Sequence, residues 1–132
     1  MNESIIPVTP GLLALLSRAG GGSNGGIAPF THEIFLLEIT VAGTTFCKEI
    51  EAIEPEIIPG KVLTLKREPD NEHDEFAIAI YHDSVRVGYV PADMNLVCSR
   101  LMDAGKLFFC RVVSTKWHNE WLKIKANIYM VE

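Results

Sequence analysis

The sequence has no apolar segment near the ~20 residues that a membrane-spanning helix requires, so we expect no integral membrane protein. It has little cysteine: Cys47, Cys98 and Cys110 show no CxxC or CxxxC spacing, which excludes a disulfide framework and a zinc knuckle. No basic residue precedes the short apolar segment 11–16, whereas a secretory signal begins with a positively charged region. We therefore expect a cytoplasmic protein with free, buried thiols.

The motifs of common catalytic classes are also missing. There is no GxSxG, no Gly-rich phosphate loop after a strand and no HExxH. The acidic segment 68–75 superficially suggests a calcium loop but lacks the glycine and the closing glutamate of an EF-hand. We expect no catalysis, no metal site and no cofactor. A metal-dependent hydrolase centred on Glu68, Asp70 and Asp74 is kept as an alternative.

Positive charge is scarce overall, with a net charge of −5, which argues against a protein that coats long duplexes. The charge is uneven, however. Residues 31–105 carry 6 basic and 14 acidic side chains, a balance of −8, whereas residues 106–131 carry 5 basic and 1 acidic side chain, a balance of +4. Local fields steer partners more than totals do. A nucleic-acid contact with a short footprint is therefore compatible with the composition.

A chain of 132 residues is expected to form one domain. Its first part differs from the rest, because Thr9 and Pro10 suit the start of a short helix and residues 19–26 are rich in glycine. We place a short N-terminal helix and a Gly-rich linker in residues 1–31. The folded domain then occupies residues 32–132.

The hydrophobic pattern of that domain predicts a mainly β fold with one principal helix. Alternation indicates strands at 34–41, 62–66, 76–81, 85–89, 107–117 and 121–131, and helical spacing indicates a helix within 91–105. The order β-β-β-β-α-β-β favours a small, partly open barrel. In the last strand the alternation predicts one buried face and exposed lysines at 123 and 125. The buried residues would be Leu122, Ile124, Ala126, Ile128 and Met130.

Several short motifs follow one another in a fixed order. They are VAGTTF at 41–46, LTLKREPDN at 63–71, Asp74, Ala77-Ile78, VGYVP at 87–91 and Gly105. Together they resemble the HIRAN family over about residues 34–131. The resemblance implies a barrel of OB-like or SH3-like character that binds single-stranded DNA at a free 3′ end and has no catalysis of its own. It further implies a role in DNA repair or stalled-fork processing, with a helicase or nuclease as protein partner.

The resemblance also implies the residues of a DNA-binding pocket. Asp74 corresponds to the aspartate that meets the terminal 3′-hydroxyl, and a carboxylate there would accept its hydrogen bond and repel a 3′-phosphate. Asn71 can bond a base or sugar edge. Phe46 corresponds to an aromatic at the pocket wall, and Tyr89 to a polar aromatic or imidazole after the glycine.

Three positions depart from the family pattern. Thr45 stands where DNA-binding members have an arginine, and Glu72 stands where they have a proline. Both changes should weaken phosphate binding and flatten its salt dependence. His73 replaces an aromatic before the aspartate, and it can still stack on a base. Thr45 and the net charge of −5 favour the second hypothesis, a protein-interaction domain that keeps the fold and has lost DNA binding.

The last hairpin offers a second candidate contact. Lys116, Trp117 and His118 lie at its turn, and Trp121, Lys123, Lys125 and Tyr129 share one face of the following strand. Aromatic and basic residues that alternate in this way are typical of single-strand platforms. The alternative is an ordinary amphipathic strand whose lysines face solvent. Arg67 is expected to support the 68–75 loop through hydrogen bonds to its backbone or to Asp74.

Overall fold

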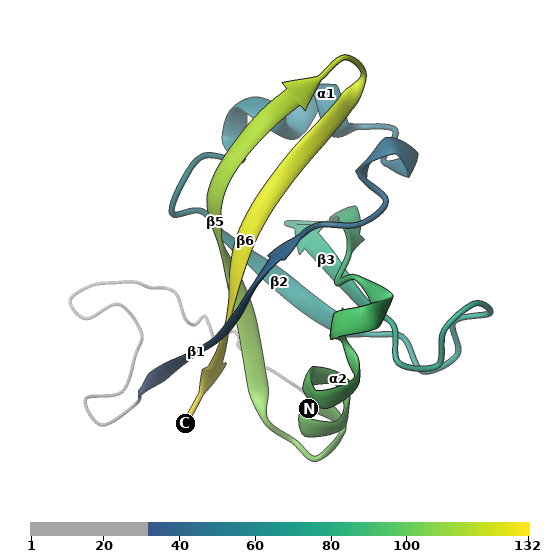
Figure 1. Ribbon diagram of the computed structural model, residues 1–132, viewed down its shortest axis with the longest axis vertical. Helices are drawn as coiled ribbons and strands as arrows, with labels where there is room; N and C mark the ends of the chain where they lie inside the picture. The colour runs from purple at the N-terminus through teal and green to yellow at the C-terminus, as the bar shows by residue number, and fades with distance from the viewer. Residues whose placement is uncertain (1–31) are drawn as a thin grey trace. The chain divides into compact units, whose positions relative to one another are not determined.

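The computed structural model describes residues 32–132, so the helix and linker predicted for residues 1–31 lie outside the described residues. Six antiparallel strands and several short helices make up the described part (Figure 1). The strands are β1 (Glu33–Thr40), β2 (Val62–Arg67), β3 (Ile78–His82), β4 (Val85–Tyr89), β5 (Leu107–His118) and β6 (Trp121–Val131). The helices are η2 (Thr44–Phe46), α1 (Ile50–Ile53), η3 (Glu54–Glu56), η4 (Ala92–Met94) and α2 (Leu96–Asp103). The prediction of a mainly β fold is confirmed.

The strands form one sheet in the order β1-β6-β5-β2-β3-β4. Its two outer strands approach each other, because Ala42, which follows β1, exchanges two backbone hydrogen bonds of 2.8 Å with Tyr89 of β4. This isolated bridge makes the sheet a partly open barrel. It also brings η2, which follows Ala42, to the strand that carries Tyr89.

Gly88 permits that close approach. A Cβ atom at this position would lie 2.4 Å from the carbonyl oxygen of Ala42 and 2.6 Å from Cγ1 of Val41. Backbone atoms cannot move aside as a flexible side chain can, so a residue without a Cβ is needed here. The glycine in the VGYVP motif therefore has a structural role in joining β4 to the end of β1.

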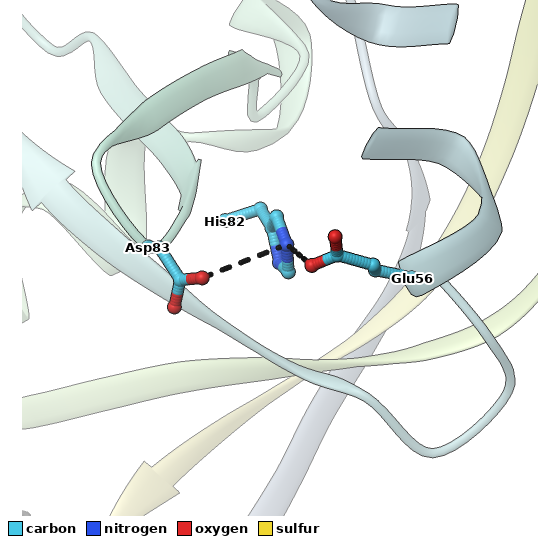
Figure 2. Close-up of side chains that lie close together, drawn as sticks. All are labelled: Glu56, His82 and Asp83. Atoms are coloured by element: carbon cyan, nitrogen blue, oxygen red, sulfur yellow. Dashed lines mark hydrogen bonds and ion pairs between the residues drawn. The ribbon is translucent and has the colours of Figure 1, made fainter. Parts of the chain in front are cut away.

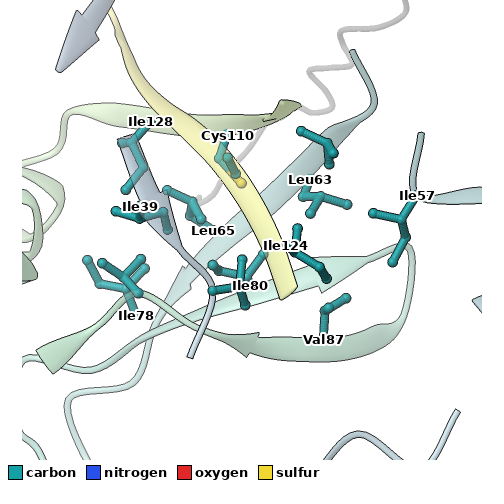
Figure 3. Packing of buried hydrophobic residues seen from close by; sticks show 14 of the residues in the cluster. Ile39, Ile57, Leu63, Leu65, Ile78, Ile80, Val87, Cys110, Ile124 and Ile128 are labelled. Atoms are coloured by element: carbon teal, nitrogen blue, oxygen red, sulfur yellow. The ribbon is translucent and has the colours of Figure 1, made fainter. Parts of the chain in front are cut away.

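The core is built from the inward faces of all six strands (Figure 3). Alternation in β6 buries Leu122, Ile124, Ala126 and Ile128, as predicted. The remaining details of that prediction are wrong: Met130 is partly buried, and Lys123 and Lys125 are half-buried rather than exposed. Lys125 pairs with Thr40 of β1 and with Ser114 of β5, and Lys123 pairs with Lys116 of β5, so neighbouring strands limit the exposure of both lysines. Cys47, Cys98 and Cys110 are free and buried, as expected.

The helical segments depart most from the prediction. The chain between β1 and β2, for which the sequence pattern predicted no helix, forms η2, α1 and η3. The predicted helix splits into η4 and the eight-residue α2, which buries Cys98 while Met94 and Val97 stay exposed. Strand β3 begins at Ile78 instead of Phe76, because the backbone of Ala77 bonds to the carbonyl of Asp74 in the preceding loop. Within residues 32–132, no helix has the length and apolar character needed to span a membrane.

Candidate nucleic-acid interface

The loop between β2 and β3, residues 68–77, is anchored at its base by Arg67. The guanidinium donates to both carboxylate oxygens of Asp103 in α2, at 2.9 and 3.1 Å. It also donates to the carbonyls of Ala77, at 2.7 Å, and Glu75, at 3.0 Å. The predicted backbone support is confirmed, but the acidic partner of Arg67 is Asp103 rather than Asp74. Sequence spacing could not indicate Asp103 as the partner, because it lies 36 residues after Arg67.

Asn71 shapes the interior of the loop. Its Oδ1 accepts hydrogen bonds from the backbone N–H groups of His73, at 2.8 Å, and Asp74, at 3.1 Å. Its Nδ2 donates to Oε1 of Glu68 at 3.1 Å. A side-chain amide has two N–H donors, so one remains for a ligand after this contact. Asn71 therefore holds the turn in the shape that presents the next three residues.

Asp74 is held from two sides. Its Oδ1 accepts a hydrogen bond of 2.8 Å from the backbone N–H of Phe76, and its Oδ2 accepts one of 2.8 Å from Nδ2 of Asn95. Asn95 is only 2% exposed, whereas Asp74 is half-buried. A carboxylate offers about four lone-pair sites, so this one keeps acceptor capacity in a fixed orientation.

Tyr89 connects the barrel to the loop. Its phenol donates to Oε1 of Glu68 at 2.9 Å, and the same oxygen accepts from Asn71. Burial, followed by the hydrogen bond to Glu68, raises the pKa of the Tyr89 phenol. The hydroxyl therefore stays protonated near neutral pH and continues to donate. One chain of bonds thus runs from β4 through Glu68 and Asn71 to the backbone of Asp74.

The side chain of Phe46 faces solvent instead of packing in the core, with 84% of its surface exposed. Gly43 begins the turn in the left-handed region, with φ of 79°, where glycine is favoured. Thr44 is buried and donates from Oγ1 to the carbonyl of Leu122 at 2.8 Å. This bond ties η2 to β6 and leaves the exposed Thr45 and Phe46 facing outward.

The predicted site residues therefore fall into two groups. Hydrogen bonds through Glu68 and the loop backbone link Asn71, His73, Asp74 and Tyr89. Phe46 lies at the end of η2, which contacts β4, the strand of Tyr89. Lys116, Trp117 and His118 lie instead at the tip of the β5–β6 hairpin, well away from the β2–β3 loop (Figure 1). There His118 lies against Trp121, with ring centroids 5.4 Å apart, and a shallow hollow beside Trp117 is lined by Glu51, Glu54 and Glu120.

Two site residues were missed by sequence reasoning. Glu68 belongs to the LTLKREPDN motif and was considered only for the metal-dependent alternative, not for the DNA-binding pocket, although it accepts hydrogen bonds from both Tyr89 and Asn71. Asn95 precedes a helix, where asparagine is an ordinary capping residue. Its amide bonds Asp74 instead of the helix. No local pattern could reveal a partner 21 residues away.

A second polar cluster lies at the β3–β4 turn (Figure 2). Nε2 of His82, a residue only 3% exposed, lies 2.8 Å from Oε1 of Glu56 and 3.7 Å from Oδ2 of Asp83. Its Nδ1 has no hydrogen-bond partner among the described residues, whereas a metal-bound histidine normally donates from its second nitrogen to an acceptor. We therefore interpret the cluster as a tie between η3 and the hairpin. Within residues 32–132, Glu68, Asp70 and Asp74 form no comparable cluster of ligand atoms.

Comparisons with known proteins place this geometry in context. A sequence model of the HIRAN domain matches residues 34–132, and no curated protein sequence matches the chain. A crystal structure of a protein from Lactobacillus plantarum is similar, with a TM-score of 0.71 and 22% identity over 77% of this chain and 98% of that chain. The HIRAN domain of human HLTF is similar with a TM-score of 0.60 and 16% identity over 75% of this chain and 78% of that chain. Both similarities establish the fold.

Proposed function

This chain belongs to the HIRAN domain family, which is known for DNA binding, and from that premise we propose that it is a non-catalytic module that binds the free 3′-hydroxyl end of single-stranded DNA. The observation that carries the proposal is the orientation of Asp74. Its carboxylate is fixed by Asn95 and by the Phe76 backbone, yet keeps unused lone pairs at a half-exposed position.

End recognition follows from the chemistry of that carboxylate. A terminal hydroxyl donates a charge-assisted hydrogen bond to Asp74, on the scale of about 1.5–3 kcal/mol. A terminal phosphate has no such donor at neutral pH, and its negative charge is repelled. Because the carboxylate is already oriented, little of this energy is lost in ordering the side chain.

Aromatic contacts supply binding that does not depend on the terminal group. Phe46 presents a large exposed ring at the end of η2, and His73 is exposed in the loop beside Asp74. Stacking of a base on such a ring contributes about 1–3 kcal/mol and tolerates any sequence. Asn71 adds a free amide N–H for a base or sugar edge.

A module of this kind acts by holding an end for another protein. It contributes affinity and end selection, and a helicase or nuclease partner acts on the strand during DNA repair or the processing of a stalled fork. This assignment rests on the family and on the binding chemistry proposed for Asp74.

Fluorescence anisotropy with three forms of one oligonucleotide tests the proposal: a free 3′-hydroxyl, a 3′-phosphate and a circularised strand. We expect tight binding of the first alone. Phe46→Ala should weaken binding of the 3′-hydroxyl strand by about 1–3 kcal/mol. Phe35→Ala, which removes another exposed phenylalanine, serves as the matched control and should bind normally. Equal binding of the linear and circular strands would contradict end recognition.

The second candidate function is protein interaction without DNA binding. It is supported by three exposed apolar residues that lie close together in the sequence, Met94 at the end of η4 and Leu96 and Val97 at the start of α2, with 39%, 48% and 67% of their surfaces exposed. Apolar side chains gathered in this way are common at protein interfaces. This function predicts no binding of any of the three oligonucleotides.

A further inference from the structure

The outer face of strands β2, β3 and β4 carries an alternating set of cationic and aromatic side chains. In the register of these strands Tyr81 of β3 pairs with Arg86 of β4, and the next row joins Lys66 of β2, Ala79 of β3 and Tyr89 of β4. Ala79 at the centre is fully buried, so the longer side chains close over it. The four long residues thus occupy neighbouring positions on one small surface.

A β-bulge places Arg86 on this face. Residues three apart in a regular strand point to opposite faces, which would separate Arg86 from Tyr89. The pairing shifts, however, between Ile80↔Gly88 and Tyr81↔Arg86, so that Val87 is an extra residue in β4. Bulges re-aim side chains in this way. Val87 remains fully buried in the core, and Arg86 is exposed on the side of Tyr89.

Both cations lie over aromatic rings. The guanidinium carbon of Arg86 is 5.3 Å from the ring centroid of Tyr89, and Nζ of Lys66 is 5.9 Å from that of Tyr81. A guanidinium that lies over a ring uses no N–H donor in that contact, so its donors stay free for a phosphate. Arg86 forms no ion pair with any carboxylate of residues 32–132, whereas Arg67 and Arg111 are bound by Asp103 and Glu33.

We propose that Arg86, supported by Tyr89 and flanked by Tyr81 and Lys66, forms a subsite for the phosphate backbone of the strand whose 3′ end lies at Asp74. The inference rests on the proposed function, because the subsite continues the end pocket through Tyr89. Glu68 is joined to this surface through Tyr89, and its carboxylate accepts hydrogen bonds from Tyr89 and Asn71.

The position of Arg86 also bears on the absence of the family arginine at Thr45. Thr45 stands where the family pattern implies an arginine, and η2, which carries Thr45, packs against β4. Burial raises the pKa of the Cys47 thiol, which directly follows Phe46, and the charge of Arg86 acts in the opposite direction. The contacts between η2 and β4 place the strand of Arg86 beside the turn that carries Thr45. Arg86 supplies from β4 the cation that η2 lacks.

The test measures binding of a 3′-hydroxyl oligonucleotide, and of its 3′-phosphate form, across a series of salt concentrations. Arg86→Ala should lower affinity for both strands about tenfold and reduce the slope of log K against log salt by about 0.7, the value for one phosphate contact on a single strand. Arg86→Lys should keep the slope and recover part of the affinity, because the charge remains without the planar stack. The ratio of affinities for the two ends should stay at the wild-type value in both variants.

The matched control is Arg111→Ala, which removes the same charge from a stacked guanidinium on β5, three strands from β4 in the sheet order. It should leave affinity and slope unchanged. Wild-type affinity and slope in Arg86→Ala, with the end preference intact, would overturn this inference and leave the proposed function standing. Absence of binding by the wild-type protein would overturn both. A thermal melt of each variant distinguishes lost contacts from unfolding.

Discussion

The amide of Asn95 donates a hydrogen bond of 2.8 Å to the carboxylate of Asp74, joining the start of α2 to the β2–β3 loop. The donor is almost wholly buried, while the acceptor is half-exposed. A bond with one buried partner is shielded from competition by water and holds the other partner in one orientation. Asp74 is therefore oriented by the fold before any ligand arrives, which is the arrangement expected of a specific binding group.

Replacing Asn95 with alanine should free the orientation of the Asp74 carboxylate without removing its charge. We expect Asn95→Ala to lower the free energy of unfolding by about 1–3 kcal/mol, because a hydrogen bond to a charged group is lost in a buried setting. We also expect the preference for a 3′-hydroxyl over a 3′-phosphate to shrink, since Asp74 can then turn away. Urea unfolding and anisotropy measure the two effects. The exposed neighbour Leu96→Ala is the control, and an unchanged preference in Asn95→Ala would refute the positioning role.

Gly88 should tolerate no side chain. Gly88→Ala places a Cβ against the backbone of Ala42 and should cost about 3 kcal/mol or more, through overpacking and the loss of the two bonds of the bridge. Gly60→Ala is the matched control: a Cβ there meets nothing within 4 Å. Its positive φ should cost about 1–2 kcal/mol. Thermal melts compare the two variants, and equal destabilisation would contradict the close-approach argument.

The strands could be predicted from the sequence, whereas the β3–β4 bulge and the Asn95–Asp74 hydrogen bond could not. Alternation placed all six strands and the buried face of β6, because the two faces of a strand differ in polarity. The same rule could not predict that an extra residue, Val87, would put Arg86 and Tyr89 on one face. Capping preferences identified neither the role of Asn95 nor the helices of residues 44–56. Those features depend on contacts between distant segments, which a local pattern does not contain.

The sequence predicted a second DNA contact at the tip of the β5–β6 hairpin, but the charges around it argue against such a contact. Three carboxylates line the hollow beside Trp117, and they should repel phosphates. We therefore expect Trp117→Ala to change affinity for a short 3′-hydroxyl strand by less than about twofold, well below the ~1–3 kcal/mol of a stacked base. Lys116→Ala should likewise leave the salt slope unchanged. A large loss in either variant, measured by anisotropy, would show that the tip contributes to binding.

Burial of the thiols predicts a loss of stability at high pH. Burial raises the pKa of Cys110 from 9.0 to about 12, so the folded state keeps a proton that the unfolded state releases. The stabilisation is complete below pH 9.0 and is lost as the pH rises from there towards about 12, by about 1.4 kcal/mol per pH unit. Urea unfolding at about pH 8, 9 and 10 measures how the free energy of unfolding changes with pH.

Cys110→Ala controls for that assignment. It should be less stable at every pH because a buried side chain is truncated, and its stability should decline less steeply above pH 9.0, the usual thiol value. Parallel curves for the variant and the wild-type protein would contradict the assignment of the slope to Cys110.

The most direct test of the account is the ratio of affinities for a 3′-hydroxyl and a 3′-phosphate strand in wild-type protein and in Asp74→Asn. The amide keeps the shape of the side chain and removes its charge, so repulsion of the phosphate is lost and the bond to the hydroxyl is weakened. We predict a strong preference for the hydroxyl end in the wild-type protein and a ratio near one in the variant, with circular dichroism showing the same fold. A variant that retains the wild-type ratio would show that Asp74 is not the group that senses the end.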